Sequence, residues 1–189
     1  GYLLDCFLRS SANDRTDAYG GSLENRARLL LEVTAAVTKV WPSQQVGVRI
    51  SPLNSFQDMK DSDPVALTEY VTSKLDEFKI GYLALVRGDL FQAQTGDVVT
   101  PARKNLKNGQ LMVNLGLTVE EAEESIAKGV FDLACFGRLP LANPDFVARA
   151  KAGAKQNEVD WATTYTKTAK GYNDYPHMTE EDLPKKEEK

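Results

Sequence analysis

One arginine stands in the middle of an alternating strand pattern. The segment QVGVRIS, Gln45 to Ser51, places valine and isoleucine side chains on one face and Arg49 on the other. In a closed parallel sheet the apolar face packs on helices, so Arg49 is expected to point into a barrel interior. An unpaired buried charge is costly, so Arg49 should meet an anion or a hydrogen-bond acceptor there, and contact with a ligand is the favoured interpretation. An ion pair with a carboxylate of the protein is the alternative.

Two glycine-containing turns follow later apolar runs and could bind phosphate. Phe136-Gly137-Arg138 combines exposed backbone N–H groups with a guanidinium that can bind phosphate through two hydrogen bonds. Asn114-Leu115-Gly116 forms a second turn before a capped helix. The loops after the last two strands of a (β/α)₈ barrel commonly bind phosphate. Glycines also end strands for steric reasons alone, which is the structural alternative for both turns.

Other residues capable of chemistry have plain structural interpretations. Tyr2 and Tyr172 could each donate a proton, but packing is the simpler interpretation of either phenol. The motif NDRTDAYGGSLENR, Asn13 to Arg26, is interpreted as a hydrogen-bonded scaffold. His177 lies near the charged C-terminal end, so no catalytic role is expected for it. The two cysteines lie far apart and outside any Cys/His cluster, which predicts neither a disulfide nor a metal site.

The elements that must position these residues alternate between strand and helix patterns. Four β-branched apolar runs are predicted as strands: Gln45 to Ser51, Ile80 to Val86, Gln110 to Asn114 and Asp132 to Phe136. Their starts are 35, 30 and 22 residues apart, close to the roughly 31 residues of one unit in a typical (β/α)₈ barrel. Four helices are predicted from signals at Ser22, Asp63-Pro64, Thr118 with Glu121, and Asn143-Pro144-Asp145. The pattern predicts an α/β fold with about four βα units.

Composition excludes several classes of protein. The 189 residues are 42% hydrophobic and 26% charged, as in soluble globular proteins. No apolar run approaches the roughly 20 residues of a membrane span, and the first residues do not resemble a secretion signal, so a cytoplasmic location is expected. The 23 basic and 27 acidic side chains give a net charge of −4 without a basic patch, which argues against a nucleic-acid partner.

Five separated motifs together resemble a known family. GYLLDCFL, NDRTDAYGGSLENR, VGVRISP, CFGRLPLANPDF and KGYNDYP are similar in order and spacing to the old yellow enzymes, which are FMN-dependent ene-reductases. The resemblance covers nearly everything from Gly1 to Pro176, and it extends to the prostaglandin F synthase branch. It implies an NADPH-dependent flavin oxidoreductase. Such an enzyme passes a hydride from FMN N5 to activated alkenes, quinones or prostaglandin endoperoxide-like substrates.

The resemblance also implies roles for particular residues. Tyr2 matches the tyrosine that protonates the substrate, and Arg49 matches the arginine beside the pyrimidine edge of the flavin. Gly137 and Arg138, together with the turn of Asn114, Leu115 and Gly116, match the phosphate end of FMN. Many members have Gly-Gly or Gly-Ala where this sequence has Leu115-Gly116.

Two aromatic residues complete the set of matches. Tyr172 in GYNDYP resembles a tyrosine that reaches the substrate pocket, and Phe91 is expected to line that pocket. The expected partner is a small molecule, with no membrane or nucleic acid, and the expected assembly is a monomer or homodimer.

Four βα units are half of an eight-unit barrel, so the chain is expected to be the C-terminal half of one. Residues 1–153 are predicted as the partial barrel, beginning with the loop and helix after strand four. Residues 154–178 are predicted as an aromatic arm that packs on it, and residues 179–189 as a disordered charged tail. The family's substrate-anchoring histidine element precedes its Gly-Tyr pair and is absent here, so activity of this chain is doubtful. The alternatives are a non-catalytic half barrel and another phosphate-binding barrel enzyme.

Overall fold

A computed structural model describes residues 2–184 of the chain. Packing divides the chain into two units, Gly1–Cys135 and Phe136–Lys189, and each is described by itself. Within residues 2–184, no helix combines the length and the apolar character that crossing a bilayer requires.

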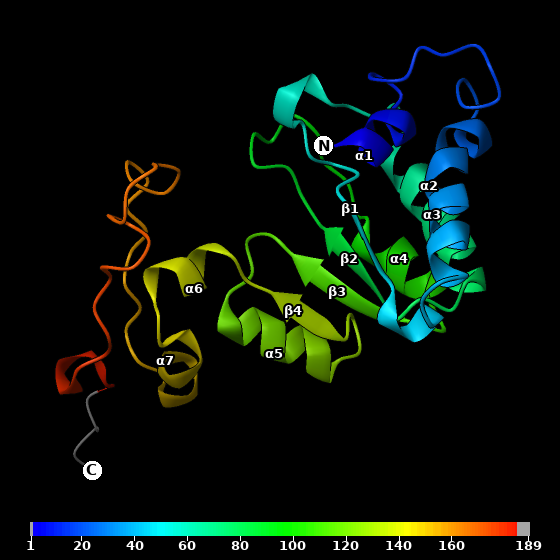
Figure 1. The fold of residues 1–189 in the computed structure, drawn as a ribbon. Coiled ribbons are helices and arrows are strands. Elements are labelled where there is room, and N and C mark those ends of the chain that lie inside the picture. Colours follow the sequence, from blue (N-terminus) through cyan, green and yellow to red (C-terminus); the bar gives the residue numbers. More distant parts are fainter. Residues whose placement is uncertain (1, 185–189) are drawn as a thin grey trace. The chain divides into compact units, whose positions relative to one another are not determined.

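A parallel sheet of four strands forms the centre of the first unit (Figure 1). Its strands β1 (Gly47–Ile50), β2 (Tyr82–Val86), β3 (Gln110–Asn114) and β4 (Leu133–Cys135) pair in sequence order. All four lie inside the runs predicted as strands, and β3 matches its prediction residue for residue. Together with the helices between them, they confirm the predicted α/β half barrel.

Three predicted helices begin directly after residues whose side chains accept a backbone N–H: α2 (Leu23–Thr38) after Ser22, α3 (Pro64–Glu77) after Asp63 and α5 (Val119–Ala127) after Thr118. A capping oxygen satisfies an N–H group that the first helical turn leaves unpaired, which explains why these starts were predictable. Helices α1 (Leu3–Leu8) and α4 (Val99–Asn105) were not predicted. Both are short, and neither N-cap residue, Tyr2 or Val98, provides a side-chain cap. A start signal for α4 does exist in Asp97, whose carboxylate accepts the backbone N–H groups of Val99 and Thr100.

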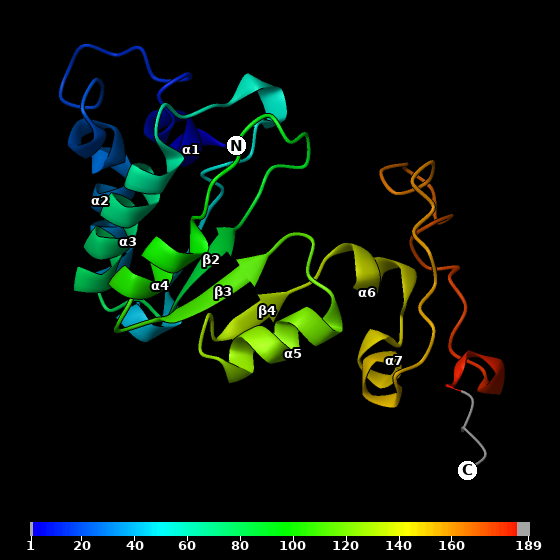
Figure 2. The ribbon, with the colours of Figure 1, turned by 180° about the vertical axis from the view of Figure 1, so that it is seen from behind.

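The helices and the sheet enclose an apolar core. Helix α3 packs beside α2 and α4, and the three lie next to one another in both ribbon views (Figure 2). Helix α5 packs against β4. Fully buried side chains fill the layer between helices and sheet: Val71, Leu75, Leu83, Leu85, Leu111 and Val113. Because buried apolar surface supplies most of the stability of a domain, this layer holds the strand ends in place.

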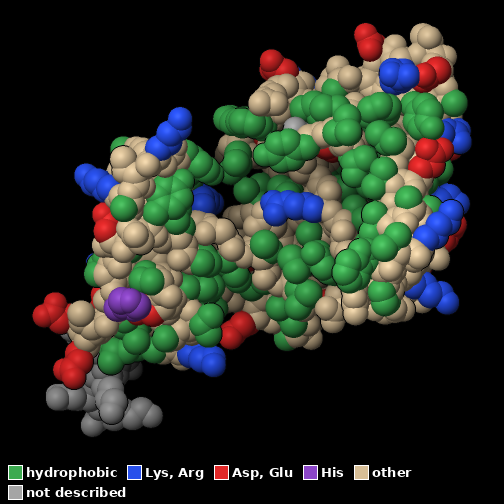
Figure 3. All heavy atoms as spheres, viewed as in Figure 1, with side chains coloured by type: hydrophobic (Ala, Val, Ile, Leu, Met, Phe, Trp, Pro, Cys, Tyr) green, Lys and Arg blue, Asp and Glu red, His purple; other side chains and the backbone are tan. Residues whose placement is uncertain are grey.

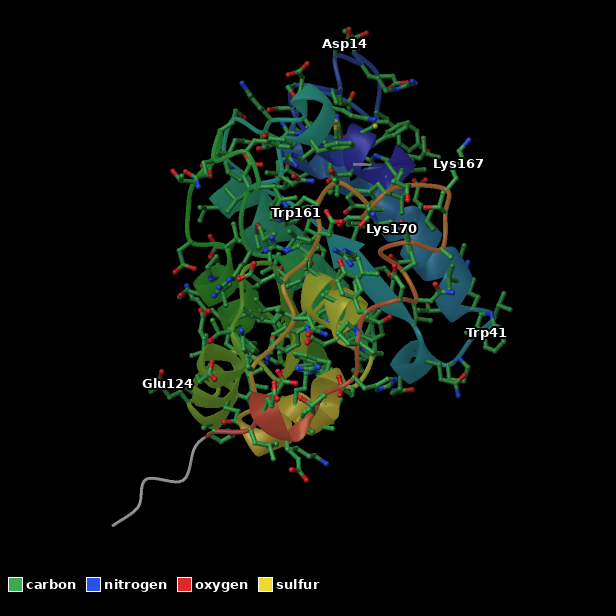
Figure 4. All side chains as sticks on the ribbon, turned by 90° about the vertical axis from the view of Figure 1, so that its left-hand side faces the viewer. Asp14, Trp41, Glu124, Trp161, Lys167 and Lys170 are labelled. Carbon is green, nitrogen blue, oxygen red and sulfur yellow. The ribbon has the colours of Figure 1, made fainter. Side chains whose placement is uncertain are left out.

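The second unit contains α6 (Arg138–Ala142), the predicted α7 (Phe146–Ala152) and a short 3₁₀ turn, η3 (Glu180–Asp182). Helix α6 was not predicted; like α1 it is short and has no side-chain cap. The arm that follows α7 carries Trp161, Lys167 and Lys170 (Figure 4).

A buried arginine on α7 anchors the chain that follows this helix. Arg149 is 1% exposed and donates hydrogen bonds to the carbonyl oxygens of Lys155 and Pro176 and to Asp145. Its guanidinium also lies 3.8 Å from Asp182, in the segment predicted as a disordered tail. Residues 185–189 of that predicted tail lie outside the described residues.

Candidate functional site

A cavity of about 800 Å³ opens at the carboxyl ends of β1, β2 and β3. Its lining comes from α1, from the loop after β1 and from the segments that follow β2 and β3. The principal residues are Tyr2, Leu3, Asp5, Arg49, Asn54, Phe56, Val86, Leu90, Asn114 and Leu115. Figure 3 shows hydrophobic side chains gathered around Lys or Arg atoms on the visible face of this unit. The volume lies within the range of pockets that bind cofactors and small ligands.

Arg49 extends into this cavity from β1. As expected, it lies on the face opposite the valine side chains, but in this structure it is exposed and not buried. The physical reason is that Arg49 projects from the sheet face that does not carry the helices, into an open cavity. Its guanidinium donates a hydrogen bond to Asn114 Oδ1 at 3.1 Å. Among the ion pairs of residues 2–184, none involves Arg49, so its charge is not neutralised by a carboxylate there.

Two aromatic predictions concern the rim of the cavity. Tyr2 lines the cavity and is 89% exposed, so its phenol is not packed in the core. Phe91 is not among the lining residues, but its ring stacks on Phe56, which is, with centroids 6.3 Å apart. Both rings are more than half exposed, at 61% and 52%. The apolar rim therefore consists of side chains with surface available for contact.

The turn after β3 has an unusual backbone. Leu115 has a φ of 90°, in the region that favours glycine, and Gly116 has a φ of 68°. Arg87 holds this conformation by donating to the Leu115 carbonyl at 2.8 Å and by pairing with Glu121. The Arg87 guanidinium also lowers the pKa of Glu121. Asn114 and Leu115 line the cavity, whereas Gly116 does not.

Arg9 holds the loops that form the mouth of the cavity. Its side chain is 0% exposed and donates to the carbonyl oxygens of Ser51, Asn54 and Met59 and to Gln94 Oε1, over distances of 2.7–3.1 Å. These acceptors belong to the loop after β1 and the loop after β2. One guanidinium therefore connects both loops to the end of α1, where it satisfies carbonyl groups that have no strand partner.

Asp89 connects the same two loops through their backbone N–H groups. Its carboxylate accepts backbone N–H groups of Ser55, Phe91, Ala93 and Gln94. Burial raises the pKa of Asp89, but the hydrogen bonds outweigh burial and hold the pKa at about 2, below the ordinary value of 3.8. The carboxylate thus stays ionised and fixes the backbone beside Phe56 and Phe91.

The remaining predicted residues belong to the second unit and are described within it. Gly137 directly precedes α6, and Arg138 begins that helix with its guanidinium 5.2 Å from the centre of the Trp161 ring. This distance fits a cation–π interaction. Tyr172 is 45% exposed and follows Gly171.

Sequence reasoning missed the residues that shape the cavity mouth. Arg9, Arg87 and Asp89 appear in the sequence as ordinary charged residues outside any motif with a physical signature. A small signal existed for Asp89, because an acidic residue shortly after a strand often accepts N–H groups of a tight loop. Nothing in the spacing distinguishes Arg9 from a surface arginine.

The motif from Asn13 to Arg26 also supports the loops near α1. Arg26 donates to the Leu8 carbonyl and pairs with buried Asp61.

Comparisons with known proteins agree with this geometry. The profile of the NADH:flavin oxidoreductase / NADH oxidase family matches residues 1–157. A probable flavin mononucleotide-dependent alkene reductase of Leishmania infantum is 49% identical over 94% of this chain and 48% of its own length. 12-Oxophytodienoate reductase 1 of Oryza sativa subsp. japonica is 41% identical over 96% of this chain and 49% of its own. The chain thus spans about half the length of these relatives.

Solved structures give the same result. The old yellow enzyme from Trypanosoma cruzi superposes with a TM-score of 0.91 and 41% identity, covering 95% of this chain and 48% of its own. Morphinone reductase superposes with a TM-score of 0.85 and 34% identity, covering 93% of this chain and 48% of its own. The predicted resemblance to old yellow enzymes is confirmed.

Replacing Arg9 should loosen both loops at the cavity mouth. We expect Arg9→Met to lower the free energy of unfolding by about 3 kcal/mol, because buried carbonyl groups lose their donor. Urea unfolding measures this, and amide hydrogen exchange should rise in residues 51–60 and 87–94. Lys107→Met removes an exposed positive charge and should change stability by less than about 0.5 kcal/mol. Equal effects of the two substitutions would contradict the role given to Arg9.

At position 115, a glycine variant should be more stable than an alanine variant, which reverses the usual order of stability. At a positive φ, Leu115→Gly should be more stable than Leu115→Ala by about 1 kcal/mol, since only glycine adopts this conformation without strain. The same pair at exposed Leu90, whose φ is not positive, should show the ordinary order. Urea unfolding of the four variants tests this. If alanine is the more stable at position 115, the positive φ is not maintained in solution.

Asp89 should make stability depend on acidity. Its pKa is lower in the folded chain than in the unfolded chain, so its contribution is present above about pH 4 and is lost as the pH falls towards 2. We expect Asp89→Asn to be less stable than the unsubstituted chain at pH 5, with this difference shrinking by pH 2. Unfolding curves at both pH values measure it. Asp14→Asn, in an exposed loop (Figure 4), serves as the control and should give a small difference at either pH. A difference for Asp89→Asn that is equal at both pH values would refute the role.

Proposed function

The chain belongs to the NADH:flavin oxidoreductase / NADH oxidase family, and on this premise we propose that its cavity holds the flavin of an FMN-dependent ene-reductase. The reaction is reduction of an activated alkene, with NADPH as the hydride donor. Because the chain spans about half the length of its relatives, the activity is a proposal for the whole protein.

The observation that carries the proposal is the positive charge of Arg49, which no carboxylate pairs with among the ion pairs of residues 2–184. It lies in a cavity of suitable size, and its partner there is the neutral amide of Asn114. A guanidinium paired with a carboxylate would present little net charge to a ligand, whereas this one keeps its positive charge. Such a group fits the pyrimidine edge of a flavin, where negative charge accumulates on reduction. Bound FMN would supply the hydride chemistry; the protein supplies position and electrostatics.

The chain's own residues have distinct proposed roles. Tyr2 is proposed as the proton donor to the substrate, since its exposed phenol lines the cavity that contains Arg49. The backbone of the turn of Asn114, Leu115 and Gly116 is proposed to contact the FMN phosphate. The Leu115 backbone supports this indirectly, because a strained turn held by Arg87 is costly to retain without a role. Gly137 and Arg138 of the second unit keep a proposed role in phosphate binding that rests on the family alone.

The substrate proposal follows from the rim and the relatives. Phe56, Leu90 and Phe91 present exposed apolar surface, which suits a hydrophobic enone or quinone. Phe91 is kept as a proposed substrate contact. Tyr172 of the second unit keeps a proposed role in substrate binding that rests on the family alone. The names of the relatives, an alkene reductase and a 12-oxophytodienoate reductase, support conjugated alkenes as the class. Prostaglandin endoperoxide-like substrates, as in the prostaglandin F synthase branch, are a narrower form of the proposal.

One observation favours a second candidate. The chain covers only 48% of the first relative, so a half barrel without catalytic activity is the alternative. An aldolase- or isomerase-type barrel enzyme, the other alternative, is disfavoured by membership of a flavin oxidoreductase family.

Titration of the purified chain with FMN tests the proposal. We expect saturable binding, seen as a change in flavin fluorescence, and Arg49→Gln should weaken it on the order of tenfold through loss of a charge-assisted contact. Lys39→Gln removes an exposed positive charge on the surface and should leave the affinity unchanged. A chain that binds no FMN would support the non-catalytic half barrel, and an Arg49→Gln variant with normal affinity would refute the role of Arg49.

A further inference from the structure

The sheet register explains how Arg49 reaches its partner. Arg49 pairs with Ala84 on β2, which pairs with Met112 on β3, so these residues lie in one row across the sheet. Asn114 lies two residues further along β3, in the row of Val86 and Cys135. Because side chains alternate along a strand, both rows face the same side. The Arg49 side chain therefore crosses β2 diagonally, and the small side chain of Ala84 leaves room for it.

Both ends of the Asn114 amide are engaged. Its Oδ1 accepts from Arg49 Nη2 at 3.1 Å, and its Nδ2 donates to the Cys135 carbonyl at 2.7 Å. The carbonyl of Cys135 requires a donor and the guanidinium requires an acceptor, so the amide has one productive orientation. The amide thereby connects β1 to β3 and β4.

We propose that Asn114 is a positioning residue that aims the Arg49 guanidinium into the cavity while leaving its charge intact. This inference rests on the proposed function. It also changes the role expected for Asn114: with both ends of its amide in use, the side chain is not available for phosphate, and only the backbone of its turn is. Among the hydrogen bonds of residues 2–184, Arg49 makes this one alone, so its other N–H groups remain available for a ligand.

The choice of an amide matters because an acid would fit the same space. Asparagine and aspartate have nearly the same shape, but a carboxylate at position 114 would pair with Arg49 and cancel its charge. It would also lose the donor to the Cys135 carbonyl and place two oxygens against each other. A neutral acceptor is therefore the group that fixes direction without neutralising the cation.

Two substitutions of Asn114 distinguish the orientation of the Arg49 guanidinium from the neutralisation of its charge. Asn114→Ala removes the acceptor, and Asn114→Asp keeps an acceptor but adds a negative charge. We expect each to weaken FMN binding, on the order of tenfold for Asn114→Asp and less for Asn114→Ala. Only Asn114→Asp should move the midpoint potential of the bound flavin to more negative values, because a neutralised arginine stabilises the reduced flavin less. Gln110→Glu, which adds the same charge at the exposed start of β3, should change neither quantity.

A measurement without flavin keeps this inference separate from the proposed function. In the unliganded chain, the ¹⁵N–¹H resonance of the Arg49 guanidinium, assigned with Arg49→Gln, should show restricted rotation that Asn114→Ala abolishes. If the chain binds no FMN, the proposed function fails and this resonance decides the inference. An unaltered resonance in Asn114→Ala overturns it. So do normal FMN affinity and potential in both variants.

Discussion

The parallel register of β1, β2 and β3 is the constraint on which the rest of the site depends. Residues paired across parallel strands face the same side, so Leu85 and Val113 share the helix-covered face while Arg49 and Ala84 share the other. A slip of one residue would turn every side chain of a strand to the opposite face. The apolar layer between the helices and the sheet therefore determines which way the Arg49 side chain points.

Different forces hold the sheet and the mouth of the cavity. The sheet is held by apolar burial, whereas the loops after β1 and β2 are held by two charged groups, the Arg9 guanidinium and the Asp89 carboxylate. Loop backbone has no neighbouring strand, so its carbonyl and N–H groups need such partners. This division makes the mouth of the cavity depend on single charged groups.

For several helices, the success of prediction follows the physics of their ends. Helices α2, α3 and α5 have side-chain caps at Ser22, Asp63 and Thr118, and the sequence predicted each start. The short helices α1 and α6 have no cap and were missed, whereas α7 was predicted without one. Helix α4 was missed although Asp97 accepts N–H groups at its start. Packing on α2 and α3 holds α1 and α4, and such packing leaves no signature in the local sequence. The expectation of a buried Arg49 failed for a related reason, because exposure depends on what covers a sheet face.

By itself, the sequence determined the strands, the capped helices, the half-barrel class, the family resemblance and the identity of Arg49 as an unusual charge in a strand. The strands, the helix starts and the position of Arg49 follow from periodicity, capping chemistry and residue type, which are local properties, and the family follows from the resemblance of five motifs. Only the tertiary structure decided that Arg49 meets a neutral amide, that Arg9 and Asp89 secure the loops, and that Leu115 adopts a positive φ. Each depends on groups far apart in the chain, such as Arg9 with Gln94 or Arg49 with Asn114, whose meeting is set by register and packing.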